Sequence, residues 1–226
     1  MKVILINGSP RKKGCTYTSL SIVAQELEKN GIETEIIQAS EKEVKHCTGC
    51  GYCQRVPKGY CVFKDDHVNE TSDKVAAADG VILGSPVYFS SMTSLASAFF
   101  CRLFRPSYRL LPDKLRHKVG AAVVCLRRSG GSVTYQQIMQ YFDMCEMPTV
   151  TSMYWPIIHG NRPEDIMQDE EGLQTLRILG SNMAWMLKNI EAGKKAGNAV
   201  PPYEEKLRTN FIRSDLDYHM ATEGLK

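Results

Sequence analysis

The sequence lacks any long hydrophobic run, and no stretch approaches the roughly 18 uninterrupted apolar residues of a membrane helix. Its start, Met1-Lys2, leads directly into an apolar segment without the small-residue cleavage site of a signal peptide. We therefore expect a cytoplasmic protein that does not enter membranes. Neither positive nor negative charge is in large excess. The net charge is +3 and the only tight basic cluster is Arg11-Lys12-Lys13, so no nucleic-acid-binding face is expected.

Common nucleotide-binding and hydrolytic motifs are absent as well. A Walker A loop requires four residues between its glycines, whereas five separate Gly8 from Gly14, and Cys15-Thr16 follows instead of Lys-Ser/Thr. No Gly-x-Gly-x-x-Gly dinucleotide fingerprint occurs. No Ser-His-Asp or Cys-His pairing can be assembled from spacing, so we propose no hydrolase and name no catalytic residue of that kind. Asp65-Asp66 is interpreted as an N-terminal helix cap rather than a paired carboxylate site.

What the sequence does have is a regular alternation of strand-like and helix-like segments over 226 residues. Strands are expected near 2–7, 32–37, 81–83, 119–126 and 149–154. Helices are expected near 16–30, 65–78, 93–103, 133–145 and 169–192. This alternation predicts an α/β fold, a doubly wound five-stranded parallel sheet between two layers of helices. The domain should span residues 1–200, with a cysteine-rich insertion at 46–61, and 201–226 should form an arm or tail.

The segment that joins the first strand to the first helix has the features of an anion site. It contains Gly8-Ser9-Pro10-Arg11 and, after two lysines, Gly14-Cys15-Thr16-Tyr17. A helix N-terminus presents unpaired N–H groups and a partial positive charge, and hydroxyl groups and Arg11 can supply further donors. The segment therefore predicts a cradle for one phosphate monoester. The alternative is a strand-to-helix turn with solvated cations.

Two further unusual loops follow the third and fourth expected strands. Residues 84–91 contain Pro86, Val87, Tyr88, Phe89 and Ser90, in which proline fixes the backbone and two aromatic rings offer flat surfaces. Residues 127–132 contain Arg128, Ser129, Gly130 and Gly131. Because the carboxyl ends of parallel strands lie at one edge, all three loops should meet there. The alternatives are core packing for the two aromatic rings and a plain turn for the two glycines.

Together these loops resemble those of flavodoxin-like NAD(P)H:FMN reductases, and the resemblance covers roughly residues 1–213. It implies a flavodoxin-like fold in which the first loop binds the ribityl phosphate of FMN and the other two hold the isoalloxazine. Arg128 would then offset the negative charge of a reduced flavin. The FMN-binding residues implied by the resemblance are Ser9, Arg11, Gly14, Cys15, Thr16, Tyr17, Pro86, Val87, Tyr88, Phe89, Ser90, Arg128, Ser129, Gly130 and Gly131. The chain departs from the family at Cys15, Ser90 and Cys101, where relatives often have Asn, Gly and Asp.

Four of the eight cysteines lie in one short segment, as Cys47, Cys50 and Cys53 followed after seven residues by Cys61. A Cys-x2-Cys-x2-Cys run lets three thiolates converge on one cubane, and the intervening glycines permit tight winding. The segment resembles that of iron–sulfur flavoproteins, in which a [4Fe-4S] cluster lies near the FMN. Free thiols or an oxidised pair remain the alternative, and zinc is disfavoured because two separated Cys-x2-Cys knuckles are missing. The remaining cysteines (15, 101, 125 and 145) are expected to be buried as small apolar residues, with Cys15 close to the phosphate.

These observations predict an FMN-dependent oxidoreductase that moves electrons between NAD(P)H or a ferredoxin-like donor and a small acceptor, through the cluster if one is present. A non-enzymatic flavodoxin-like electron carrier is the alternative, and a binding module without turnover is a third hypothesis. The resemblance also implies a homodimer or homotetramer with the flavin near a subunit boundary. The loop 154–162 and the tail after Pro201, with Tyr203 and Phe211, are the expected interface elements.

Overall fold

The computed structural model describes residues 1–107, 111–204 and 207. Most of the expected arm, including Phe211, lies outside the described residues. Where the arm begins, Arg116 donates hydrogen bonds to the carbonyl groups of Pro201 (2.7 Å) and Pro202 (3.2 Å). Its guanidinium carbon also lies 5.7 Å from the centre of the Tyr203 ring. The first residues of the arm are therefore attached to the body of the protein.

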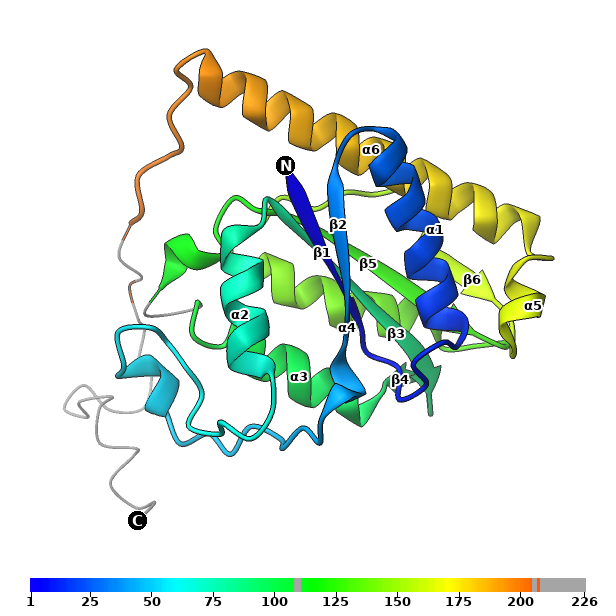
Figure 1. The fold of residues 1–226 in the computed structure, drawn as a ribbon, viewed down its shortest axis with the longest axis horizontal. Helices are drawn as coiled ribbons and strands as arrows, with labels where there is room; N and C mark the ends of the chain where they lie inside the picture. The colour runs from blue at the N-terminus through cyan, green and yellow to red at the C-terminus, as the bar shows by residue number, and fades with distance from the viewer. Residues whose placement is uncertain (108–110, 205–206, 208–226) are drawn as a thin grey trace.

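The centre of the molecule is a parallel sheet with the strand order β2-β1-β3-β5-β6 (Figure 1). The parallel strands are β1 (Lys2–Asn7), β2 (Glu33–Gln38), β3 (Gly80–Tyr88), β5 (Val119–Leu126) and β6 (Ile157–His159). A short β4 (Ser91–Met92) pairs antiparallel with the end of β3. This confirms the predicted doubly wound sheet, in which the order of connection reverses between β1 and β3. Ligands of such sheets bind at this switch point, beyond the carboxyl ends of the strands.

Helices cover both faces of the sheet, so the fold has the predicted three layers (Figure 1). The helices are α1 (Cys15–Lys29), α2 (Val68–Ala77), α3 (Ser94–Phe104), α4 (Gly131–Asp143), α5 (Pro163–Ile166) and α6 (Glu170–Lys195). Short 3₁₀ turns lie at η1 (Ala39–Glu41), η2 (Tyr52–Gln54) and η3 (Pro112–Lys114). Within the described ranges, no helix has both the length and the hydrophobicity needed to cross a membrane.

Alternate side chains of β1 enter two separate hydrophobic cores, as expected of a strand that is buried on both faces. Ile4 and Ile6 pack with residues of α2, α3 and α4, whereas Val3 and Leu5 pack with residues of α1 and α6. All four side chains are fully buried. Packing against both cores fixes the position of β1, and therefore the point from which the loop after β1 leaves the sheet.

The expected strand at 149–154 is wrong. Thr149 forms only an isolated bridge with Gly120, and β6 begins at Ile157, opposite Val124. The chain advances eight residues from Thr149 to Ile157, whereas the stretch of β5 that they pair with, from Gly120 to Val124, advances only four. The extra residues bulge out between Pro148 and Pro156. The carbonyl groups of Pro148 and Pro156 each accept from β5 at 2.9 Å, but proline has no N–H to donate in return, so the ladder lapses between them. The apolar pattern misleads because the bulge itself carries the exposed Met153, Tyr154 and Trp155.

Candidate functional site

The loop between β1 and α1 turns its carbonyl groups toward polar side chains at the ends of β1 and β2. Asn7, which is fully buried, donates from its amide to the carbonyl groups of Arg11 and Lys12, both at 3.4 Å. Gln38 donates to the carbonyl group of Ser9 at 2.7 Å and accepts from Asn7 at 2.6 Å. These bonds occupy the acceptors of the loop. The N–H groups of Ser9 and Arg11 are also bonded, to the side chains of Asn7 and Ser9 at 3.1 Å each, so the donors left for an anion are those at the start of α1.

Helix α1 begins at this loop without a side-chain cap and without an acidic residue in its first turn. The hydroxyl group of Thr16 is buried there and has no hydrogen-bond partner. Its neighbour is the thiol of Cys125, a weak hydrogen-bonding group. A buried hydroxyl without a partner is costly, and a phosphate oxygen would satisfy it. The helix N-terminus therefore fits the predicted phosphate cradle.

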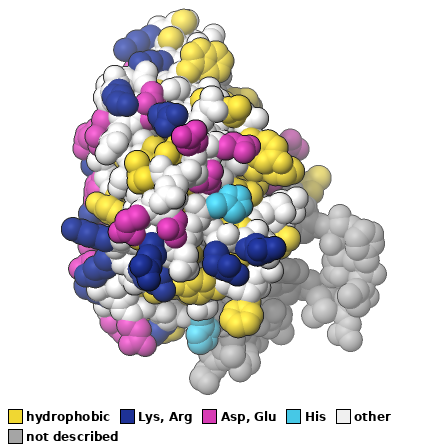
Figure 2. Space-filling view, turned by 90° about the vertical axis from the view of Figure 1, so that its right-hand side faces the viewer, with side chains coloured by type: hydrophobic (Ala, Val, Ile, Leu, Met, Phe, Trp, Pro, Cys, Tyr) yellow, Lys and Arg dark blue, Asp and Glu magenta, His cyan; other side chains and the backbone are white. Residues whose placement is uncertain are grey.

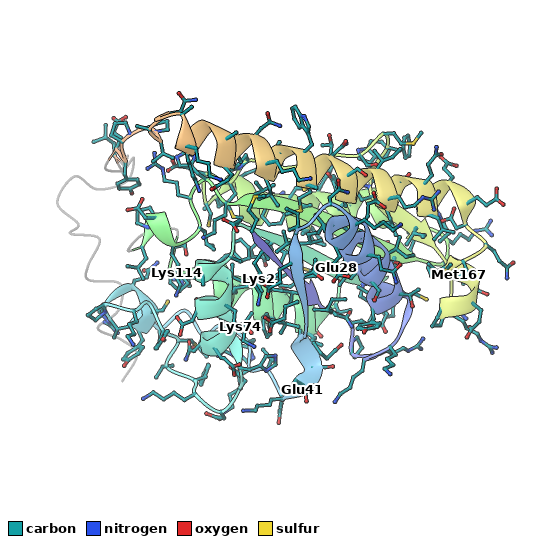
Figure 3. All side chains as sticks on the ribbon, turned by 45° about the horizontal axis from the view of Figure 1, so that its top comes forward. Lys2, Glu28, Glu41, Lys74, Lys114 and Met167 are labelled. Atoms are coloured by element: carbon teal, nitrogen blue, oxygen red, sulfur yellow. The ribbon has the colours of Figure 1, made fainter. Side chains whose placement is uncertain are left out.

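Other predicted residues of this loop have mixed surroundings. The hydroxyl group of buried Ser9 accepts from the N–H of Arg11 at 3.1 Å, which fixes the turn. Lys12 forms an exposed ion pair with Glu41 at 3.4 Å, and Figure 3 labels Glu41 at the end of η1. Cys15 donates to the carbonyl group of Gly160 at 3.8 Å, and burial raises the pKa of its thiol. Cys15 therefore links α1 to the segment that follows β6. Tyr17 is half-buried on the first turn of α1.

The second predicted loop is a β-hairpin rather than a simple loop. Strand β3 continues through Pro86 and Val87 to Tyr88, which pairs with Ser91 of β4. Phe89 and Ser90 form the turn, and their φ angles of 50° and 57° are those of a type I′ hairpin. A left-handed conformation costs a non-glycine residue on the order of 1–2 kcal/mol. Phe89 is fully exposed at 106% and Tyr88 is 44% exposed, so core packing does not explain these rings.

Direct contacts join the three predicted loops at one edge of the sheet, as the sequence indicated. The N–H of Gly8 donates to the carbonyl group of Gly84 at 2.8 Å. The hydroxyl group of Thr93, which caps α3, donates to the carbonyl group of Gly8 at 2.7 Å. In the third loop, a Cβ on Gly130 would lie 2.8 Å from the Cα of Ser90. Gly130 therefore permits the close approach of the third loop to the hairpin.

The third loop presents polar groups on its outer side and glycines on its inner side. Arg128 and Ser129 are exposed. Gly130 has a φ of 89° and precedes α4, and Gly131 is buried against Ile157. The face at which β3 and β5 end carries basic, acidic and hydrophobic side chains without a field of one sign (Figure 2). This arrangement suits a small polar ligand better than an extended polyanion.

The four cysteines of the 46–61 segment line one small cavity, together with Arg102 and Arg105 of the α3 region. Its volume is about 20 Å³, which accommodates roughly one water molecule. Among the described residues, no three His, Cys, Asp or Glu side chains lie close enough to hold a metal ion. Gly49, Gly51 and Gly59 all have positive φ angles, so these glycines do permit the tight winding.

The cysteines differ in their electrostatic surroundings. Burial raises the pKa of Cys53 to about 11, although the positive charge of Arg105 opposes the shift. Burial and the neighbouring Cys47 raise the pKa of Cys101. Cys101 is half-buried rather than buried, so its expected burial as an apolar residue is wrong. Cys125 and Cys145 are buried as predicted, and burial raises the pKa of each to about 12.

Sequence reasoning missed several side chains that shape these sites. Thr93 carried a readable signal, because a threonine directly before a helical segment is a common N-cap. Gln137 of α4 accepts from the hydroxyl group of Ser91 (3.0 Å) and the N–H of Met92 (3.2 Å), and nothing in its local sequence indicates this. Arg102 interrupts an apolar helical face, which is a signal of a buried ion pair.

Comparisons with known proteins agree with this geometry. Residues 1–162 match the family described as NADPH-dependent FMN reductase. An iron–sulfur flavoprotein of Methanocaldococcus jannaschii is 38% identical over 198 residues, which are 84% of this chain and 100% of that protein. An iron–sulfur flavoprotein of Archaeoglobus fulgidus is 32% identical over 179 residues, 78% of this chain and 86% of that protein.

Solved structures support the fold alone, because their sequence identities are low. RosB, solved with bound 8-demethyl-8-formylriboflavin-5'-phosphate, aligns with a TM-score of 0.64 at 15% identity over 96% of this chain and 94% of that chain. A flavodoxin from the domain Archaea aligns with a TM-score of 0.56 at 16% identity over 83% and 99%. The chain therefore belongs to the NADPH-dependent FMN reductase family of flavodoxin-like, FMN-dependent oxidoreductases, and its relatives include proteins named iron–sulfur flavoproteins.

Proposed function

We propose that this chain is an FMN-dependent oxidoreductase that moves electrons between NAD(P)H or a ferredoxin-like donor and a small acceptor, through a [4Fe-4S] cluster. The observation that carries the proposal is the presence of two separate constellations in one chain. Three loops meet at the switch point of the sheet, and four cysteines line one cavity beside two arginines. The names of the relatives support this combination.

The residues of the sheet edge fit FMN. The N–H groups of the first turn of α1 and the unpartnered hydroxyl group of Thr16 would hold the phosphate. The hairpin at 86–90 and the loop at 128–131 would flank the isoalloxazine, with Arg128 supplying a positive charge for the reduced ring. Flavin itself supplies the hydride and electron chemistry. The protein binds it, orients it and controls access of water.

The cysteine segment fits a cluster in its donor chemistry, because Cys47, Cys50, Cys53 and Cys61 supply four thiols that line one cavity. The guanidinium group of Arg105 beside them would offset part of the negative charge of an iron–sulfur cubane, whereas that of Arg102 is paired with Asp66. The cavity of about 20 Å³ must open for loading. The segment has little regular structure to lose, since η2 is its only helical turn among the described residues.

The enzymatic proposal and the flavodoxin-like carrier can be separated by anaerobic rapid-mixing experiments on the FMN-loaded protein. We expect NADH, NADPH or a reduced ferredoxin to bleach the flavin band, and a quinone or free flavin to restore it over many turnovers. Reduction by a protein donor without turnover from either nicotinamide would instead identify a carrier. Failure to bind added FMN would contradict both.

We also propose that the chain assembles as a homodimer or homotetramer. The exposed Met153, Tyr154 and Trp155 of the bulge support this, because adjacent large apolar side chains seldom remain in contact with water. Light scattering after gel filtration should give a mass of at least two chains. A monomer at micromolar concentration would contradict this proposal without affecting the flavin site.

A further inference from the structure

Arg102 of α3 is almost completely buried, with 3% of the residue exposed. Leaving a buried guanidinium without partners is costly, so the fold must satisfy its donors. Asp66, also buried, accepts from Nη1 at 2.5 Å and from Nη2 at 3.1 Å. This bidentate pair is charge-neutral, and it leaves Nε free for another acceptor.

The remaining bonds of Arg102 all go to the cysteine segment or its ends. Its Nε donates to the Sγ of Cys61 at 3.2 Å. Its Nη1 donates to the carbonyl group of Lys45 at 3.1 Å, and its Nη2 lies 3.5 Å from that of Phe63. Lys45 lies two residues before Cys47, and Phe63 lies two residues after Cys61. One side chain of α3 therefore attaches both ends of the segment.

Cys61 is fixed from a second side by Asn69 of α2. The amide oxygen of Asn69 accepts from the N–H of Cys61 at 2.7 Å, and its amide nitrogen donates to the carbonyl group of Cys61 at 3.1 Å. Two helices thus hold one cysteine, with Asn69 on its backbone and Arg102 on its thiol. The thiol of Cys47 is beside that of Cys101, and no guanidinium bond to the sulfur of Cys47, Cys50 or Cys53 is found among the described residues.

We propose that Arg102 is a positioning residue for the cluster: its Nε–H bond orients the Cys61 thiolate and raises the cluster's reduction potential. This inference rests on the proposed function, because it requires a cluster at the four cysteines. One-electron reduction adds negative charge to the cluster and its sulfur ligands. A hydrogen bond to a ligand sulfur stabilises the reduced form more than the oxidised form, which shifts the potential upward.

The test compares wild-type protein with Arg102→Lys and Arg105→Lys, all purified without oxygen. Lysine at position 102 keeps a positive charge beside Asp66 but removes the Nε–H that points at Cys61. Arg105 lines the same cavity, and its change to lysine preserves charge without removing the Arg102 bond. Iron, sulfide and FMN are quantified, and the cluster potential is measured by potentiometry with electron paramagnetic resonance.

We expect Arg102→Lys to retain FMN. The equilibrium constant for one-electron reduction of its cluster should fall about tenfold, which is a downward shift of the reduction potential of ~59 mV. Arg105→Lys should shift the potential much less. Loss of iron from Arg102→Lys with full FMN content also supports the positioning role. Equal potentials in wild-type and Arg102→Lys would overturn the inference. FMN without iron in wild-type protein would instead overturn the proposed cluster.

A second measurement has a decisive outcome in the wild-type protein alone. Resonance Raman spectra of the wild-type cluster in H₂O and D₂O report exchangeable protons bonded to cysteine sulfur. We expect one Fe–S(Cys) stretching band to shift on deuteration in wild-type protein and in Arg105→Lys, and the shift to be lost in Arg102→Lys. Wild-type spectra without any deuterium shift would contradict the Nε–H bond.

Discussion

The two candidate redox sites of this chain are built in different ways. The flavin edge is made of strand ends and helix starts, and its loops are joined by short bonds such as Thr93 to Gly8 at 2.7 Å. The segment 46–61 contains one three-residue turn, and side chains of α2 and α3 attach it to the body. The first site follows from the fold, whereas the second depends on a few individual contacts.

This difference indicates that the two cofactors act differently on the structure. FMN would enter a site whose donors and glycines already lie in place. A cluster would reorganise a segment whose thiols surround only about 20 Å³, so its binding energy would also order the chain. Variants that remove one cofactor should therefore leave the other, and the following predictions test that independence.

The largest expected effect is loss of the cluster in Cys50→Ser. Serine is a poor ligand for an iron–sulfur cluster, so iron should fall from about four per chain to nearly none, while FMN content stays unchanged. Iron and flavin assays on one sample measure both. Cys145→Ala, a change in the hydrophobic core, is the matched control and should keep its iron. A Cys50→Ser protein with a full complement of iron would show that these cysteines do not hold the cluster.

The second effect concerns the flavin edge, where Gly130→Ala should weaken FMN binding at least tenfold and leave the iron content intact. Gly130 has a φ of 89°, and its new Cβ would lie 2.8 Å from Ser90. Gly197→Ala is the control, because Gly197 has a φ of 86° but no atom within 4 Å of a new Cβ. Both changes should cost about 1–3 kcal/mol of stability. FMN affinities are measured by flavin fluorescence titration. Equal affinities of Gly130→Ala and Gly197→Ala would contradict an approach of the third loop to the flavin ring.

A smaller effect is expected for Thr16→Val, which removes the unpartnered buried hydroxyl group at the start of α1. Loss of one hydrogen bond to a charged phosphate should weaken FMN binding about tenfold. Riboflavin, which has no phosphate, should bind equally to wild-type and variant. Ser21→Ala, on the same helix but bonded to the carbonyl group of Tyr17, is the control. An equal loss of riboflavin affinity would place the effect away from the phosphate.

The smallest effect involves thiols of the core rather than of the cysteine segment. The pKa of Cys145 is raised by burial to about 12 from an ordinary value of 9.0. The folded thiol therefore keeps its proton at a pH where the unfolded chain loses it, so its contribution to stability is present below pH 9 and is lost as pH rises toward 12. For one thiol the free energy of unfolding falls by about 1 kcal/mol between about pH 9 and 10. Urea denaturation at several pH values should show a smaller fall in the free energy of unfolding for Cys145→Ala than for wild-type protein. Identical dependence of that free energy on pH in the two proteins would contradict the raised pKa of Cys145.

Much of the fold could be predicted because its signals are local. Apolar runs such as 119–126 and glycine or proline breaks mark each element within a few residues, and the rule that parallel strands end at one edge then brings the three loops together. The bulge at 149–157 could not be predicted, because it depends on pairing with Gly120 and Val124 far away in the sequence. An apolar bulge and an apolar strand have the same composition.

The cysteine segment shows the same limit. Spacing grouped Cys47, Cys50, Cys53 and Cys61, but the predicted helix cap at Asp65-Asp66 is wrong. Helix α2 has His67 at its N-cap position without a side-chain cap, and Asp66, one residue earlier, accepts from the N–H of Val68 at 3.1 Å. Nothing in the sequence showed that the same carboxylate pairs with Arg102, because the two residues lie 36 positions apart. Such long-range polar pairs are fixed only when two helices pack, and their partners cannot be identified from local patterns.

The most direct test of two independent redox sites is the cofactor content of protein purified without oxygen. A visible spectrum and assays of iron, sulfide and flavin are made on the same sample. We predict one FMN and about four irons and four sulfides per chain. FMN without iron would contradict the cluster at the cysteine segment, and absence of flavin even after FMN is added would contradict the central claim.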